Sequence, residues 1–508
     1  MLPFAAARRR AAPRVAALLV ALAVPLPAQD AALRDRLRQH VEVLASPDFA
    51  GRGTGQHGFE RAAAYVSEQM ARIGLEPLGD DGTYRQAVPW TRVEGDPAQC
   101  RVRGEAGGEV VELAPGPDFA GRVWFDQDAT GAPLDVRVPA DGDVALDAEE
   151  ARGKVLLVEL TGADLDARFA GPDGAAAWTA LQAKLRAPGP AAVLFVDDAR
   201  ARRLGGLEGT TAPGRGSPTR GAERRPNELF VSRAARDRLL ALGAGATVRV
   251  AIVLREAPAP ACNVVGRLRG ADEAARDEHV VIGCHLDHLG VKDGVVYPGA
   301  DDDASGTAAV LALAEALAAA PDRPRRSLVF VAFCGEEVGL QGSRHFVHHC
   351  PVPLPSIVAE LQLDMIGRSE EGAHETREQN ANSLHLIGTE KLSADLHRLC
   401  VELNRAAGGF ALEWDQEDVF WRSDHVNFAR MGVPVAFFFT GFHADYHQPT
   451  DTADKIEWDK LERVTRYVQA VARRLADDEE RPHVDQAAWR KHREALRGPV
   501  EPAAPLRR

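Results

Sequence analysis

Acidic and imidazole side chains follow directly after apolar runs in the second half of the chain. Each run has the length and apolar character of a strand. Residues that can bind a metal or move a proton follow each one. In chain order they are His285 and Asp287 after His279–Cys284, the loop GADDDASG at 299–306, Glu336 and Glu337 after Ser327–Cys334, Asp364 after Ile357–Leu363, and YHQPTD at 446–451 after Val433–Thr440.

Carboxylates that converge without a counter-charge repel one another and raise each other's pKa values. One or two divalent cations remove that cost. Imidazole with carboxylate, and no thiolate, is typical of zinc or another borderline metal in a catalytic site. Two metals that share a carboxylate can activate one water between them. A nearby carboxylate must then take the proton, and adjacent Glu336 and Glu337 can divide these tasks.

The elements that must position these residues alternate between strands and helices. Helical periodicity predicts helices over Ala304–Ala320, Leu340–His349, Leu392–Arg405 and Leu461–Leu475. Near-continuous apolar strands alternating with helices predict an α/β domain with a mostly parallel central sheet and helices on both faces. Ligands of such sheets bind beyond the carboxyl ends of the strands, so the residues above are expected at one edge.

Six motifs in order resemble the dizinc aminopeptidase family, which also includes glutamate carboxypeptidase and the transferrin receptor. The resemblance covers about residues 29–96 and 261–477. The β-rich stretch between them is similar to the protease-associated domain that is often inserted there. The motifs are HLDHLG (285–290), GADDDASG (299–306), CGEEVGLQGS (334–343), LDMIG (363–367), RSDHVNFARMGVP (422–434) and YHQPTD (446–451).

This resemblance implies two Zn²⁺ per chain and a role for each matching residue. Asp302 would bridge the metals. Glu336 would be the general base, and the Asp287 carboxylate would orient His285. Asp451 is expected to hold the loop of His447. The implied ligands are His285 and Asp364 on the first metal, Glu337 and His447 on the second, and Asp302 on both.

One position departs from the family pattern. Family members often carry a tyrosine just ahead of the R-S-D-H segment, where its phenol can stabilise an oxyanion, whereas this chain has Trp421. An indole offers only an N–H donor. Oxyanion stabilisation is therefore expected to rest on the metals or on Arg422.

The first residues predict export. Arginines precede the apolar run 15–24, which ends near the small residue Ala28, as in a secretory signal peptide. The predicted division is a signal peptide (1–28), a first peptidase part (29–96), an inserted β-rich domain (97–257), a second peptidase part (258–478) and a polar tail (479–508). The mature protein is expected in the periplasm or outside the cell.

Composition narrows the possible partners. The 508 residues are 45% hydrophobic and 27% charged, with a formal net charge of −13. This acidic balance and the lack of a basic stripe argue against nucleic acid as a binding partner. After the leader no apolar segment is long enough to span a membrane. Six cysteines are too few for a disulfide scaffold of this length, and the sequence leaves the oligomeric state open.

The sequence favours an aminopeptidase acting on peptides and leaves two alternatives open. One is a carboxypeptidase or a glutaminyl-cyclase-like enzyme on the same fold. The other is an inactive binding scaffold, as the transferrin receptor illustrates. Asp301 and Asp303 are expected to cap a helix. The remaining histidines His345, His348, His349 and His425 are expected to be helix-surface or packing residues.

Overall fold

The computed structural model describes residues 26–490, apart from 140–143, 145, 162–168, 170–173, 205, 214–225, 293–294, 373–374, 415–416, 486 and 489. Residues 1–25 of the predicted signal peptide and residues 491–508 of the predicted tail lie outside the described part. None of the described helices is long and apolar enough to cross a membrane.

The main sheet is mixed. Its central strands β19, β16, β20 and β23 pair in parallel, while β15 and β21 join on either side in antiparallel fashion. The predicted α/β class is confirmed, and the strands begin and end within a few residues of the predicted runs. In sheet order they are β1 (Glu76–Pro77), β15 (Cys262–Leu268), β19 (Ser327–Phe333), β16 (His279–His285), β20 (Ile357–Leu363), β23 (Val435–Phe439), β21 (Ser383–Ile387) and β22 (Ala411–Glu413), with β2 (Arg85–Ala87) also on β15.

Helices cover both faces of this sheet, which is why the residues of its central strands are buried throughout. One apolar cluster packs one face under α1, α2, α8, α11 and α13, and a second cluster packs the other face under α9, α10 and α12. Their bounds are α1 Leu26–Leu44, α2 His57–Ile73, α8 Gly306–Ala318, α9 Gln341–His348, α10 Thr389–Leu392, α11 Ala394–Leu403, α12 His425–Arg430 and α13 Trp458–Asp477.

The glycine-rich segment before α2 brings the N-terminal part of the chain against the loops that follow β16. Its short helix η1 spans Pro47–Arg52. Gly51 has φ +66°, and a Cβ placed there would lie 2.2 Å from the carbonyl oxygen of Tyr297. Only glycine allows this close approach, so the glycines serve backbone packing.

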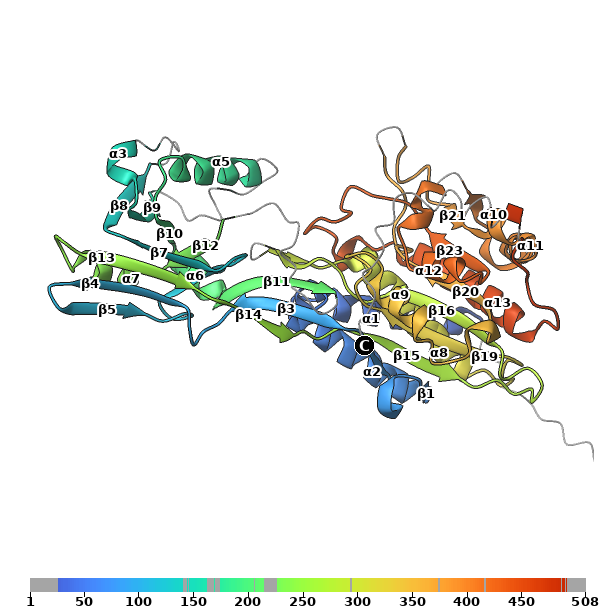
Figure 1. The fold of residues 1–508 in the computed structure, drawn as a ribbon. Coiled ribbons are helices and arrows are strands. Elements are labelled where there is room, and N and C mark those ends of the chain that lie inside the picture. Colours follow the sequence, from blue (N-terminus) through green and yellow to red (C-terminus); the bar gives the residue numbers. More distant parts are fainter. Residues whose placement is uncertain are drawn as a thin grey trace, which may run out of the picture.

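A second, β-rich region lies between β3 and β14. These two strands pair antiparallel, with Thr91 opposite Pro258, so the chain enters and leaves the region side by side (Figure 1). Its larger sheet runs β14 (Leu254–Pro258), β3 (Trp90–Gly95), β11 (Leu207–Pro213), β6 (Phe119–Arg122), β12 (Glu228–Val231), β10 (Ala192–Val196), β9 (Val155–Leu160) and β8 (Pro133–Val138), and its smaller sheet runs β5 (Glu109–Leu113), β4 (Arg101–Ala106), β13 (Thr247–Ile252) and β7 (Gln127–Gly131).

Helices α3 (Ala148–Ala151), α5 (Gly174–Arg186), α6 (Asp198–Leu204) and α7 (Arg233–Leu240) belong to the same β-rich region. Figure 1 shows this region at one end of the molecule and the helix-covered sheet at the other, with β3, β11 and β14 between them. The motifs predicted to bind metal all lie at the helix-covered end.

Candidate metal centre

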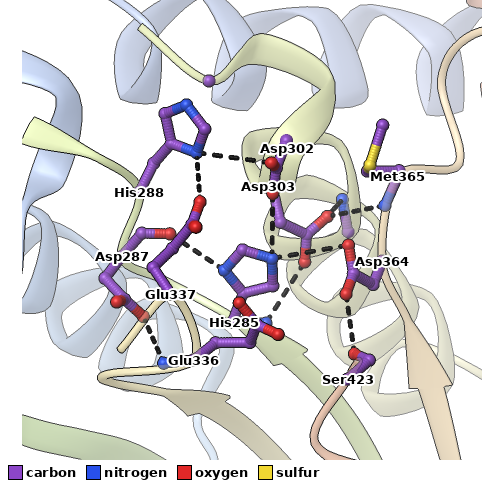
Figure 2. A network of polar contacts seen from close by, with 12 residues as sticks. His285, Asp287, His288, Asp302, Asp303, Glu336, Glu337, Asp364, Met365 and Ser423 are labelled. Atoms are coloured by element: carbon purple, nitrogen blue, oxygen red, sulfur yellow. Dashed lines mark hydrogen bonds and ion pairs between the residues drawn. The ribbon is translucent and has the colours of Figure 1, made fainter. Parts of the chain in front are cut away.

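The polar residues predicted from strand ends meet at one edge of the main sheet. His285 is the last residue of β16, Asp364 follows β20, and Glu336 and Glu337 follow β19. Because these strands are parallel neighbours, their carboxyl ends lie side by side. Figure 2 shows the side chains pointing toward one another from these ends and from the loop that precedes α8.

Asp302 stands between two imidazoles. Its Oδ1 lies 3.1 Å from His285 Nε2, and its Oδ2 lies 3.2 Å from His447 Nε2. Asp364 Oδ1 lies 3.4 Å from the same His285 nitrogen, and Glu337 Oε2 lies 3.1 Å from the same His447 nitrogen. Two donor sets therefore share one carboxylate, with one oxygen of Asp302 in each.

These spacings fit a pair of cations. Ligand atoms at about 2.0–2.2 Å from one tetrahedral zinc lie about 3.3–3.5 Å from each other, close to the N–O separations found here. Asp302 Oδ2 and Glu337 Oε1 are buried and accept no hydrogen bond of standard geometry among the described residues, although imidazole nitrogens of His447 and His288 lie close to them. Buried carboxylate oxygens without donors are costly unless a cation is present, so the donor set suits two zinc ions.

Glu336 faces the pocket beside these ligands. Burial, with the neighbouring carboxylates of Asp364 and Glu337, raises the pKa of Glu336 well above its usual value. A carboxyl group of raised pKa next to a metal site is a candidate for general acid–base chemistry.

The role predicted for the Asp287 carboxylate is wrong in one respect. His285 Nδ1 is 2.9 Å from the main-chain oxygen of Asp287, so the carbonyl orients the ring. The Asp287 carboxylate instead accepts the N–H of Glu336 at 3.2 Å. Thr54 Oγ1 accepts the N–H of Gly335 at 3.0 Å. Asp287 and Thr54 therefore fix the backbone that carries the acid pair.

His288 is a residue that the sequence analysis did not single out. It is buried, with Nδ1 2.7 Å from Glu337 Oε1 and 3.5 Å from Asp302 Oδ2. A Cβ on Gly299 would lie 2.5 Å from the His288 ring, so the backbone holds the imidazole closely in place. The sequence signal that could have identified His288 was its place in the HLDHLG motif, three residues after His285.

Carboxylates of the supporting loops hold Asp302 in place. Asp451 accepts the N–H groups of Asp301 and Asp302 at 3.1 and 3.2 Å, so it anchors the Asp302 loop to its own loop, which also carries His447. Asp303 accepts the N–H of Gly306 at 2.8 Å at the start of α8, as expected for a cap. Asp301 is not a cap: its Oδ1 accepts the N–H of Gly367 at 2.6 Å, and the prediction for it is wrong.

The electrostatics of the centre follow from these contacts. Burial opposes ionisation of Asp302, yet the imidazoles of His288, His285 and His447 hold the pKa of this carboxyl well below its usual value. Asp302 is thus kept as a carboxylate, the form that a metal requires.

The pocket beside the candidate metal ligands has an apolar wall and a polar rim. The wall is formed by Met365, Val419, Phe437, Phe439 and Phe442. At the rim Arg422 Nη2 donates to Tyr446 Oη at 3.0 Å, and the Tyr446 ring stacks on His447 with centroids 3.9 Å apart. Trp421 packs edge-on against Phe420. A phenol therefore reaches the pocket from Tyr446, although position 421 lacks one.

The fold and the site define a class of protein: an α/β protein whose clustered imidazoles and carboxylates can hold two metal ions beside a further carboxylate. Residues 263–472 match the model described as Peptidase family M28. The family model thus covers the part of the chain that builds the site, about two fifths of its length, and the predicted resemblance is confirmed for that part.

Curated relatives match part of this chain. Aminopeptidase YwaD of Bacillus subtilis is 30% identical over 199 residues, which are 36% of this chain and 39% of the relative. The probable lipoprotein aminopeptidase LpqL of Mycobacterium tuberculosis is 30% identical over 202 residues, which are 35% of this chain and 39% of that protein. The chain thus spans about two fifths of the length of each.

Among solved structures, the aminopeptidase from Aneurinibacillus sp. strain AM-1 is 20% identical, with a TM-score of 0.47. That likeness covers 88% of this chain and 95% of the other.

Proposed function

We propose that this protein is a zinc-dependent exopeptidase, an aminopeptidase that removes N-terminal residues from peptides. The observation that carries the proposal is the shared carboxylate of Asp302, which lies 3.1 and 3.2 Å from imidazole nitrogens of His285 and His447. The names of the curated relatives agree with this activity.

The proposed roles follow from the contacts. His285, Asp302 and Asp364 would hold one zinc, and His447, Asp302 and Glu337 the other. When bound, two zinc ions supply a water of lowered pKa and polarise the scissile carbonyl. Glu336 takes the proton of the attacking water and passes it to the leaving amine, as its position and raised pKa suit.

Tyr446 is the proposed partner of the developing oxyanion. Its oxygen accepts a hydrogen bond from Arg422, so its own proton is available for donation toward the pocket that it lines. A donor aimed at developing negative charge stabilises the transition state. This assignment replaces the expectation that Arg422 or the metals alone would serve.

We also propose the finer organisation predicted from the sequence. Residues 97–257 are a protease-associated-like insertion, and residues 1–28 are a signal peptide that sends the protein to the periplasm or outside the cell. The antiparallel pairing of β3 with β14 supports an insertion, since it brings both ends of the region together.

Hydrolysis of aminoacyl anilides, with N-acylated anilides as controls and with a chelator added, tests the proposed function. We expect release of anilide only from substrates with a free amine, and its loss when zinc is removed. Cleavage of N-acylated peptides from the C-terminus would instead indicate a carboxypeptidase. A purified protein that binds no zinc and hydrolyses none of these would be a binding scaffold.

A further inference from the structure

Arg422 is the only arginine or lysine among the described residues that line the pocket beside the metal ligands. The guanidinium lies over the ring of Phe442, with Cζ 4.7 Å from its centroid, and 5.8 Å from that of Tyr446. Its Nη2 donates to Tyr446 Oη at 3.0 Å. Two aromatic faces and one hydrogen bond thus hold an exposed cation in a defined place.

The chain connects Arg422 to both halves of the metal centre. The next residue, Ser423, donates from Oγ to Asp364 Oδ2 at 2.6 Å, on the side of the first donor set. Tyr446, which Arg422 contacts, precedes and stacks on His447 of the second set. A substrate whose carbonyl lies between the two sets therefore has Arg422 at its edge.

The Arg422 guanidinium has more N–H donors than its observed contact uses. A guanidinium carries five N–H donors in a planar fork, which matches the two oxygens of a carboxylate. Among the residues that the structure describes, Tyr446 accepts the one side-chain hydrogen bond from this fork, and no carboxylate forms an ion pair with it. The apolar wall below it offers no competing anion, since Met365, Val419 and Phe442 are uncharged.

We propose that Arg422 recognises a carboxylate of the substrate, and thereby selects anionic peptides for the aminopeptidase activity proposed above. The positive charge of Arg422 repels the free α-ammonium group, which the acidic side of the pocket attracts. Arg422 therefore faces another part of the substrate. That part is either the acidic side chain of the N-terminal residue or the C-terminal carboxylate of a very short peptide.

Two matched substrate pairs distinguish these sources. Leucyl-glycine and leucyl-glycinamide differ only in the C-terminal charge, whereas glutamyl and glutaminyl p-nitroanilide differ only in the side-chain charge. We expect the wild-type zinc enzyme to prefer the charged member of one pair. Arg422→Met should lower kcat/KM for that member about 10- to 100-fold more than for its neutral partner, and any loss shared by both members reports the hydrogen bond that Tyr446 loses.

Two further variants complete the experiment. Arg422→Lys keeps the charge without the fork and should restore part of the preference. Arg398→Met removes an exposed arginine of α11 and should leave both ratios unchanged. If Arg422→Met loses the preference for the charged member only in the dipeptide pair, Arg422 recognises the C-terminal carboxylate. If it loses this preference only in the anilide pair, Arg422 recognises the acidic side chain.

Several results would overturn the inference while leaving the aminopeptidase intact. These are a wild-type enzyme with no preference in either pair, an Arg422→Met enzyme with unchanged ratios, or an equal loss on all substrates. The last result would show that Arg422 acts only by positioning Tyr446 or at the reacting carbonyl. If zinc-loaded wild-type protein hydrolyses none of the substrates, the proposed function itself fails, and this inference fails with it.

Discussion

Asp302 and Glu336 divide the work of the proposed centre between them. Asp302 lies within 3.2 Å of two imidazole nitrogens and is held in place through its backbone N–H by Asp451. Glu336 forms no hydrogen bond with an imidazole among the described residues, and burial and Asp364 raise its pKa against the opposing charge of His285. One carboxylate is thus kept ionised for metals, while the other can exchange a proton.

Replacing Glu336 by glutamine should separate these roles. Glu336→Gln keeps the size and polarity of the side chain but cannot take a proton. We expect both zinc ions to remain, as measured by metal analysis, and kcat to fall by about three orders of magnitude. His447→Ala is the matched contrast, because it should lose metal and activity together. Wild-type kcat in Glu336→Gln would refute the assigned base.

His288 should matter for the second cation. His288 Nδ1 lies 2.7 Å from Glu337 Oε1, so it orients the carboxylate that contacts His447 through its other oxygen. Loss of a partner that orients a ligand typically costs about 10–100-fold in metal affinity. In His288→Ala we expect the affinity for the more loosely bound zinc to fall by this factor, as measured by competition with a chromophoric chelator.

An exposed histidine serves as the control for this measurement. His483→Ala removes an imidazole from the surface and should bind zinc as the wild type does. Unchanged zinc affinity in His288→Ala would reduce His288 to a packing residue.

The sequence could predict which strand-end residues meet, because parallel strands bring their carboxyl ends together. It could not tell whether the side chain or the main chain of Asp287 orients His285, since both are within reach of a residue two positions away. Nor could it separate His288 from other histidines, because its contact with Glu337 depends on how two distant loops pack.

At the scale of elements, the N-terminal segment holds the loops of the proposed metal centre. Arg52 is buried, and its guanidinium donates to the carbonyl oxygens of Leu286 at 2.9 Å, Pro298 at 2.7 Å and Gly299 at 2.8 Å. Arg52 and Pro298 are 246 residues apart. The loop after β16 and the loop before α8 are therefore tied together by one side chain from η1.

Arg52→Met should destabilise the fold and loosen the metal site. The substitution leaves several buried carbonyl oxygens without donors, each of which costs about 1–3 kcal/mol. We expect the free energy of unfolding in urea to fall by about 3 kcal/mol or more, together with weaker zinc binding. Arg405→Met, which removes an exposed arginine, is the control. Equal stability of Arg52→Met and this control would contradict the assigned role.

The helices and strands were predictable to within a few residues, because their apolar periodicity is local. The contribution of Arg52 was not, since no local pattern marks an arginine that reaches three carbonyl oxygens of distant loops. The glycines beside it did give a signal: Gly51 can approach the Tyr297 carbonyl only because it lacks a Cβ.

At the scale of the whole molecule, buried neutral histidines set the response to acid. Burial lowers the pKa values of His40 and His279 to about 4 and that of His425 to about 3. In the unfolded chain histidine titrates near about 6.5. Below that pH the unfolded state binds protons that the folded state does not, so stability falls as the pH drops from about 6.5 toward 4.

His279→Gln should weaken this dependence. His279 Nδ1 lies 2.8 Å from Ser356 Oγ, and glutamine can replace that contact without titrating. Between pH 6.5 and 4 we expect the wild type to lose about 2–3 kcal/mol more than the variant, measured by urea unfolding at each pH. Above pH 7 the free energies of unfolding of the wild type and of His279→Gln should change with pH in parallel. A variant with the full wild-type slope would show that His279 does not contribute.

The sequence predicted only part of the overall architecture. The α/β class followed from the alternation of strands and helices. The order of strands in the β-rich region did not, because pairings such as β3 with β14 join residues that are far apart in the chain and carry no local mark. That region has no donor set comparable to the one at the sheet edge, among the residues that the structure describes.

The most direct test is anomalous diffraction at the zinc absorption edge, from crystals of the protein loaded with zinc. Two peaks about 3.5–4 Å apart are expected, one against His285 and Asp364 and the other against Glu337 and His447, with Asp302 touching both. A single peak, or peaks that leave His285 and His447 without a metal, would contradict the account.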